Sequence, residues 1–142
     1  YGKHLDNDVV PALYNKFDGT TFYLQKIMNV LFMRTHEGET CHKDSLSAAV
    51  NYVVDFSSET YEDLIYQLPE RQKQVLLTIS RERKARNITS SAFVRKYSLT
   101  SASSVNSAVK GLLDKGLLTH NRGVYQVYDL FLDVWIRERY LK

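Results

Sequence analysis

The chain has 142 residues, of which 44% are hydrophobic and 25% are charged, a composition typical of globular proteins and not of disordered ones. Its single cysteine excludes a disulfide scaffold and any zinc site built from several cysteines. No apolar run approaches the ~20 residues of a membrane span, and no signal peptide precedes the first expected helix. We therefore expect a cytoplasmic protein without a membrane partner. Because residue 1 is Tyr and not an initiator Met, we also expect a piece of a larger protein.

The net charge of +3 conceals two halves of opposite sign. Residues 1–68 carry 5 Lys and Arg against 10 Asp and Glu, a net charge of −5, whereas residues 69–142 carry 14 against 6, a net charge of +8. A step of this size predicts two modules with different partners. The basic half is compatible with nucleic acid, although a solvated basic surface would carry the same charge.

The first half begins with two predicted helices. Acidic and amide caps at residues 6–8 start one helix, which ends at the Asp-Gly turn of residues 18–19. A threonine at position 20 or 21 caps the second helix, whose apolar residues at positions 24, 27, 28 and 31 follow helical spacing. Additional apolar residues, including Phe22 and Phe32, predict that this second helix is buried on most sides.

A third, long helix completes the first half. A polar loop over residues 36–43 precedes it, and Asp44 or Ser45 provides its cap. Residues 57–58 are its weakest stretch and could hold a break. Pro69 marks the end of this half, because the residue before a proline resists the helical region, and the charge step falls at the same place. We therefore predict a three-helix, lid-like bundle over residues 1–68.

Cap and turn signals predict a different order of elements in the second half. The expected elements are a helix over residues 69–84, a connection at 87–89 with Ile88 as a candidate strand residue, a short helix capped by Thr89 or Ser90, a turn at 98–100, a helix capped by Ser101 and stopped by Gly116, a hairpin over 117–128, and a last helix capped by Asp129. Helix, short helix, turn, helix and hairpin, in that order, indicate a winged helix-turn-helix.

The predicted fold class is thus mainly α, with a small β-hairpin wing. The second domain covers residues 69–142 and includes a C-terminal helix over 129–142, where Phe131 and Trp135 must be buried against the bundle or a partner.

The third helix of the winged motif is the predicted recognition helix. Short polar and basic side chains on its outward face, on the wing tip and on the preceding short helix are candidate DNA-binding residues: Ser103, Asn106, Ser107, Lys110, Arg122, Arg95 and Lys96. The same short polar residues are found on any solvent-facing helix. The outward face carries one Lys and no Arg, which is a small number of cations for a helix that reads a DNA groove. DNA and protein therefore both stay open as partners.

Three short segments resemble the C-terminal region of archaeal-type and bacterial P-loop ATPases related to the STAND and AAA+ class. These are residues 17–25 (FDGTTFYLQ), residues 68–72 (LPERQ) with Val75 and Leu76, and residues 125–129 (YQVYD) with Leu130, Phe131 and Trp135. The resemblance implies a helical lid followed by a winged helix, with ATP and Mg²⁺ bound by an upstream nucleotide-binding domain. It also implies nucleotide sensing at Gly19 and Thr21, although Thr21 stands where the family often has a Pro that packs near adenine.

The chain itself is not expected to be an enzyme or to hold a cofactor, because it contains no phosphate-binding loop and no strand that ends in paired acids. His36, Cys41 and His42 share one loop but lack a fourth ligand, so we expect no metal and no catalytic residue there. The expected function is a regulatory, DNA- or protein-docking module of such an ATPase. Two alternatives are a free-standing winged-helix DNA-binding transcription regulator and a winged helix that binds only protein.

Overall fold

The computed structural model of the chain describes residues 2–142 and is mainly helical, with a small antiparallel sheet near the C-terminus, which confirms the predicted fold class. The chain divides into two compact units, the first ending at Ser57 and the second beginning at Ser58. The sequence had placed the division at Pro69. The helix between these two points belongs to the second unit, because its residues Tyr61 and Ile65 are buried and it packs against the C-terminal helix.

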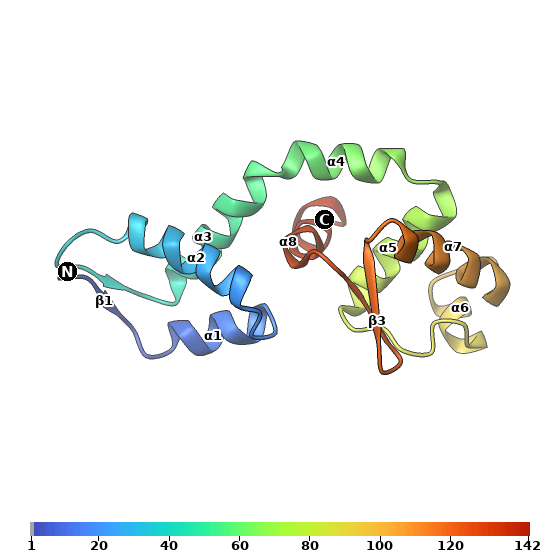
Figure 1. Cartoon of the computed structure of the whole chain (residues 1–142), viewed down its shortest axis with the longest axis horizontal. Helices are drawn as coiled ribbons and strands as arrows, with labels where there is room; N and C mark the ends of the chain where they lie inside the picture. The colour runs from blue at the N-terminus through green and yellow to red at the C-terminus, as the bar shows by residue number, and fades with distance from the viewer. Residues whose placement is uncertain (1) are drawn as a thin grey trace. The chain divides into compact units, whose positions relative to one another are not determined.

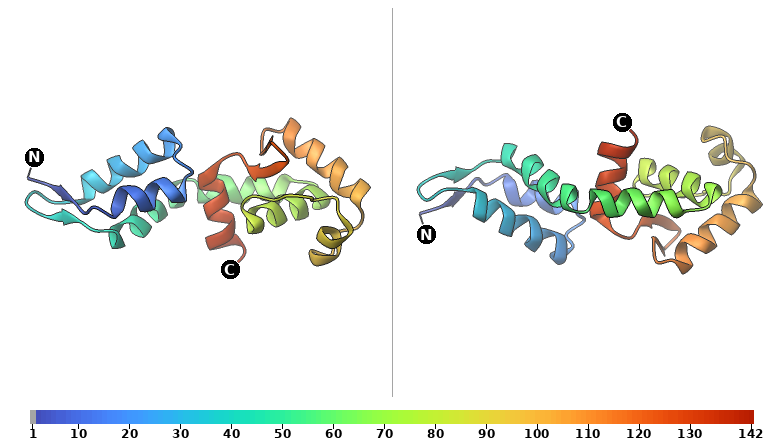
Figure 2. Two further views of the ribbon diagram at one scale, coloured as in Figure 1. Left: turned by 90° about the horizontal axis from the view of Figure 1, so that it is seen from below. Right: turned by 90° about the horizontal axis from the view of Figure 1, so that it is seen from above.

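Residues 2–57 of the first unit form three helices and two short strands. The helices are α1 (Val9–Lys16), α2 (Thr21–Arg34) and α3 (Asp44–Phe56), and Figure 2 shows them side by side. Strands β1 (His4–Leu5) and β2 (Thr40–Cys41) form a parallel pair in which His4 is opposite Thr40. The predicted start of α1 and the turn at residues 18–19 are confirmed, since both turn residues have positive φ.

Three features of the first unit differ from the sequence prediction. The residues at the N-cap positions of α1, α2 and α3 are Asp8, Thr20 and Lys43, and none of their side chains makes a cap hydrogen bond, although the sequence predicted side-chain caps at the start of all three helices. The loop expected over residues 36–43 contains β2, which the sequence could not indicate because two-residue strands carry no alternation pattern. Helix α2 is not buried on most sides, since the side chains of Phe22 and Phe32 are 64% and 57% exposed. Only one stripe of α2 is buried, and it includes Ile27 and Leu31.

The second unit begins with α4 and contains the predicted winged-helix elements in the expected order (Figure 1). Its elements are α4 (Ser58–Gln67), α5 (Glu70–Glu82), α6 (Ser91–Lys96), α7 (Ala102–Asp114), β3 (Leu118–Asn121), β4 (Val124–Val127), α8 (Leu130–Trp135) and the π-helix η1 (Ile136–Tyr140). None of the helices among residues 2–142 combines the length and apolar character needed to cross a membrane.

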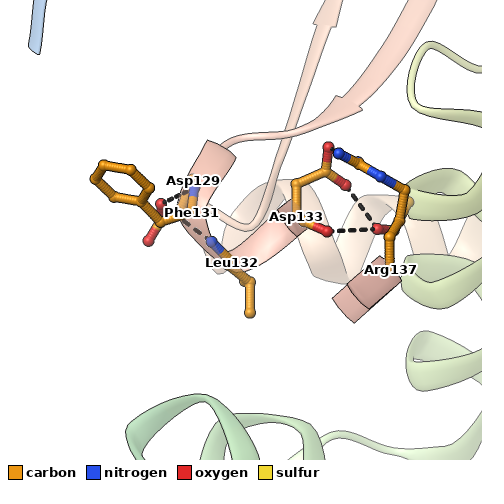
Figure 3. A network of polar contacts seen from close by, with 6 residues as sticks. Asp129, Phe131, Leu132, Asp133 and Arg137 are labelled. Carbon is orange, nitrogen blue, oxygen red and sulfur yellow. Dashed lines mark hydrogen bonds and ion pairs between the residues drawn. The ribbon is translucent and has the colours of Figure 1, made fainter. Parts of the chain in front are cut away.

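Side-chain caps set the start of three helices in this unit, as the sequence predicted. The hydroxyl of Ser90 accepts a hydrogen bond from the N–H of Phe93, and that of Ser101 accepts one from the N–H of Ser104. The carboxylate of Asp129 accepts from the backbone at the start of α8 (Figure 3). Each cap satisfies a backbone donor that has no partner within its own helix.

The segment between α5 and α6 pairs with the wing through Ala85 and not through Ile88. The N–H of Ala85 donates to the carbonyl of Tyr125 at 2.8 Å, and the reverse bond has the same length. The apolar character of Ile88 suggested a strand residue, but its side chain is instead buried in the core.

Helix α8 is held against α4 and α5. The Trp135 side chain is 2% exposed, its indole N–H donates to the Ser58 hydroxyl at 3.0 Å, and its ring lies 5.6 Å from that of Tyr61. Asp133 is equally buried; its carboxylate accepts from the Ser80 hydroxyl at 2.6 Å and pairs with Arg137 in the π-helix (Figure 3). The predicted burial of Phe131 and Trp135 is thus confirmed.

Protonation of Asp133 at acid pH is expected to increase the stability of the fold, because it removes the free-energy cost of burying a charged carboxylate. Burial raises the pKa of this carboxyl above its ordinary value, against the opposing effects of the Ser80 hydroxyl and of the Arg137 and Arg83 charges. Because the folded pKa is above the unfolded one, the folded state binds this proton more readily, and stability from this group rises as pH falls. Asp133→Asn should remove the dependence. Urea unfolding of both proteins between pH 4 and pH 7 measures it, and a constant difference across that range would contradict the prediction.

Candidate functional site

Helix α7 has one buried and one exposed face. Its buried residues Val105, Ala108, Val109 and Leu112 pack in the core, with α5 as the main contact. On the outward side, four of the predicted DNA-binding residues are exposed: Ser103, Asn106, Ser107 and Lys110. The structure therefore brings these four side chains together on the surface of one helix, as their spacing predicted.

The side chain of Gln72 on α5 lies against Gly111 on α7. A Cβ atom at Gly111 would lie 2.3 Å from the side-chain nitrogen of Gln72, which is too close for any real contact. The same Gln72 side chain accepts a hydrogen bond from the Lys115 ammonium at 2.6 Å. The Gln72 side chain thus occupies the space beside α7 and links the two helices.

The wing is a regular hairpin with its basic residue at the tip. Leu118 opposite Val127 anchors it in the core, and the rings of His120 and Tyr125 stack with centroids 4.0 Å apart. Arg122 and Gly123 form the two-residue turn, both at positive φ, which matches the right-handed twist of the strands. Arg122 is exposed, and the structure shows no ion pair for it or for Lys110 within residues 2–142.

The two predicted residues on α6 have different surroundings. Arg95 is exposed and donates to the Ser91 carbonyl at 3.3 Å. The Lys96 ammonium lies 3.1 Å from the Glu82 carboxylate, which also accepts the Tyr97 hydroxyl. These bonds from Tyr97 and Lys96 hold the pKa of Glu82 below its usual value. Lys96 is therefore exposed but already paired, which the sequence did not indicate because Glu82 is in another helix.

Sequence reasoning missed a cavity beside the α7 face. It has a volume of about 350 Å³ and lies where α5 and α7 begin. The Arg71 guanidinium donates to the Ser104 hydroxyl at 2.8 Å across it. Ser103 and Ser107 line this cavity as well as belonging to the exposed face of α7. Serines at positions 101, 103 and 104 were visible in the sequence, but the arginine that contacts Ser104 is 33 residues away from it.

The two residues implied in nucleotide sensing lie at the turn between α1 and α2. Gly19 has φ +68°, and the Tyr14 ring covers it so closely that a Cβ there would lie 2.6 Å from a ring carbon. Thr21 is exposed at the first position of α2. Any ligand that contacted Gly19 on this side would have to displace the Tyr14 ring.

Cys41 and His42, which share a loop with His36, lie in different environments. Cys41 is buried, whereas His42 is exposed and pairs with Asp6, an acid that raises the pKa of the imidazole. Across the part of the chain that the structure describes, no group of three or more His, Cys, Asp or Glu residues is arranged to hold a metal ion.

Comparison with known proteins agrees with the arrangement of α5, α6, α7 and the wing. The family model described as "Probable winged helix domain" matches residues 59–138, which begin within α4 and end within the π-helix. No curated protein and no solved structure matches the chain significantly. Since the match covers more than half of the chain and coincides with the second compact unit, the chain belongs to the winged helix domain family.

Proposed function

We propose that the winged helix binds DNA, mainly through backbone phosphates. The observation that carries this proposal is the pair of exposed cations Lys110 and Arg122, on α7 and the wing tip, for which the structure shows no ion pair within residues 2–142. Phosphate contacts dominate the affinity of proteins for DNA. A Lys or Arg side chain that binds a phosphate releases the counterions that had condensed on the DNA at that position.

Sequence preference is expected to be small. Bidentate recognition of guanine requires Arg or Lys aimed at base edges, and α7 presents one Lys and no Arg among its residues. Ser103, Asn106 and Ser107 can donate to phosphate oxygens as well as to base edges, and of the three only Asn106 has a side chain that can bind one base, adenine, through two hydrogen bonds.

Substitution of Lys110 or Arg122 should flatten the salt dependence of DNA binding. Each phosphate contact contributes about −0.9 to the log–log slope of affinity against salt, so Lys110→Ala and Arg122→Ala should each reduce the slope by about one unit. Fluorescence anisotropy of the full chain on unrelated duplexes, at several salt concentrations, measures the slope. Lys142→Ala is the matched control, because it removes the same charge at the C-terminal residue.

Two outcomes would contradict this function. Absence of binding even at ~50 mM salt, where phosphate contacts are strongest, would place the winged helix in the protein-docking class. Binding that survives high salt and strongly prefers one duplex would show that Ser103, Asn106 and Ser107 read bases.

A protein-docking role is the second candidate, and the first unit favours it. This unit exposes large apolar side chains on all three helices, and exposed apolar surface is the kind of surface that protein partners cover. They include Val10, Tyr14, Phe22, Phe32, Met33, Tyr52 and Phe56. We propose that an upstream nucleotide-binding domain of the same protein covers part of them. The support is the resemblance of residues 17–25 to the lid of archaeal-type and bacterial P-loop ATPases and the three-helix form of this unit.

In this proposal ATP and Mg²⁺ belong to the upstream domain, and the present chain has no ATPase activity of its own. The reason is that its sequence contains no phosphate-binding loop. Phosphate release should stay at background when the purified chain is incubated with saturating ATP and Mg²⁺. Release that follows the chain through gel filtration, at constant specific activity, would contradict the proposal.

A further inference from the structure

The cavity between α5 and α7 has a lining that contains one cation, several hydroxyl groups and no carboxylate. Its lining residues are Pro69, Arg71, Gln72, Ser101, Ser103, Ser104, Ser107 and Ala108. Glu70, the nearest acid in sequence, is not part of the lining and instead faces Lys73 at 4.0 Å. A hollow lined by a guanidinium and hydroxyls, without an acid, suits an anion that has several oxygen acceptors.

The hydrogen bonds inside the cavity leave donors available. The Ser104 hydroxyl oxygen accepts from Arg71 at 2.8 Å, and the Ser101 hydroxyl oxygen accepts from the Ser104 N–H at 3.0 Å. A hydroxyl that accepts one bond still has its own proton to donate. Arg71 uses one of its five N–H groups in this contact, so the guanidinium retains donors for a second acceptor.

The cavity is continuous with the proposed DNA-binding face. Ser103 and Ser107 line the cavity and also belong to the outward side of α7 that carries Lys110. A duplex that rests on that face would therefore bring its backbone to the opening of the cavity. We propose that the cavity receives one DNA backbone phosphate, with Arg71 as its principal ligand and the Ser104 hydroxyl as a second donor. This inference rests on the proposed function and names the anchoring contact within it.

The anchoring contact fixes position and carries no sequence information. A phosphate held by Arg71 on α5 and Ser104 on α7 would set the angle at which α7 meets the duplex. Loss of the contact should weaken binding equally on all duplexes, because phosphates are the same in every sequence.

Arg71→Gln tests the proposal in the full chain. The substitution should lower the magnitude of the salt slope by about 0.9. The ratio of the parent's DNA affinity to that of the variant should therefore fall about 3-fold between 50 and 200 mM salt. Arg71→Lys should keep the slope, because it keeps the charge, and should lose only part of the affinity. Ser104→Ala should weaken binding without changing the slope, because it removes no charge. Lys142→Gln is the control for net charge, and thermal unfolding checks that each variant is folded.

The outcomes separate this inference from the proposed function. Equal effects of Arg71→Gln and Lys142→Gln, in a parent chain that binds DNA, would overturn the cavity as an anchor and leave DNA binding intact. Failure of the parent to bind any duplex at ~50 mM salt would overturn both. A third arm titrates inorganic phosphate into the chain and follows backbone amide NMR shifts. Phosphate binding that needs Arg71, without an effect of Arg71→Gln on DNA, would make this a free-anion site and overturn the proposal.

Discussion

Leu112→Ala is expected to destabilise the winged helix by about 2–5 kcal/mol. The Leu112 side chain is fully buried, with 0% of its surface exposed, and it belongs to the face of α7 that packs on α5. Truncation removes buried methyl groups and leaves a cavity that a close-packed core fills only partly. Ser103→Ala, on the opposite and exposed face, should change stability by less than about 0.5 kcal/mol.

Fluorescence of Trp135 during urea unfolding measures both effects. Trp135 is the one tryptophan of the sequence and is buried in the second unit, so its emission reports on that unit. Circular dichroism also reports on unfolding of the helices in the first unit. If it shows two separate transitions, the free energy of unfolding has to be fitted for each unit individually. Equal losses for Leu112→Ala and Ser103→Ala would mean that the buried face of α7 is assigned incorrectly.

Trp135→Ala should have a comparable or larger effect, about 3–5 kcal/mol. The indole fills the contact between α8 and α4, where it lies against Tyr61 and donates to Ser58. Its removal takes away the largest side chain of α8 and leaves the Ser58 hydroxyl without this donor. Trp135→Phe separates the two contributions, because it keeps a ring and loses the N–H, and a buried hydrogen bond contributes on the order of 1 kcal/mol.

Tyr66→Ala provides the matched control for this prediction. Tyr66 is also an aromatic residue and lies in α4, but its side chain is 86% exposed, so its truncation should cost little. Unfolding followed by circular dichroism measures all three variants on one scale. A Trp135→Ala effect as small as that of Tyr66→Ala would show that α4 does not depend on α8, and the boundary at Ser57 would then lose its physical basis.

The winged-helix elements could be predicted because each is specified locally. Ser90, Ser101 and Asp129 cap the helices that the sequence assigned to them, and the caps act within three residues along the chain. The buried face of α7 follows from 3.6-residue spacing alone. The hairpin follows from two β-like segments on either side of residues 120–123, although β3 extends to Asn121 and shortens the turn to two residues. The break between α3 and α4 at Ser57 was visible as the weakest part of a long helical pattern.

Features that depend on distant residues could not be predicted. The pairing of β1 with β2 joins strands of two residues each, whose pattern is too short to detect. Phe22 and Phe32 extend the apolar pattern of α2, yet hydrophobicity does not reveal which apolar side chains are buried. Lys96 and Arg95 are neighbours in sequence, and only the position of Glu82 distinguishes the paired one from the other.

The sequence alone determined the class of fold, the order of helices and wing, and the polar face of α7, because spacing and capping act over a few residues. Only the tertiary structure decided that α4 belongs with the winged helix, since the contact of Tyr61 with Trp135 spans most of that unit. It also decided the cavity, because Arg71 and Ser104 meet only when α5 packs on α7. Such contacts arise from packing between whole elements, and no local pattern in the chain records them.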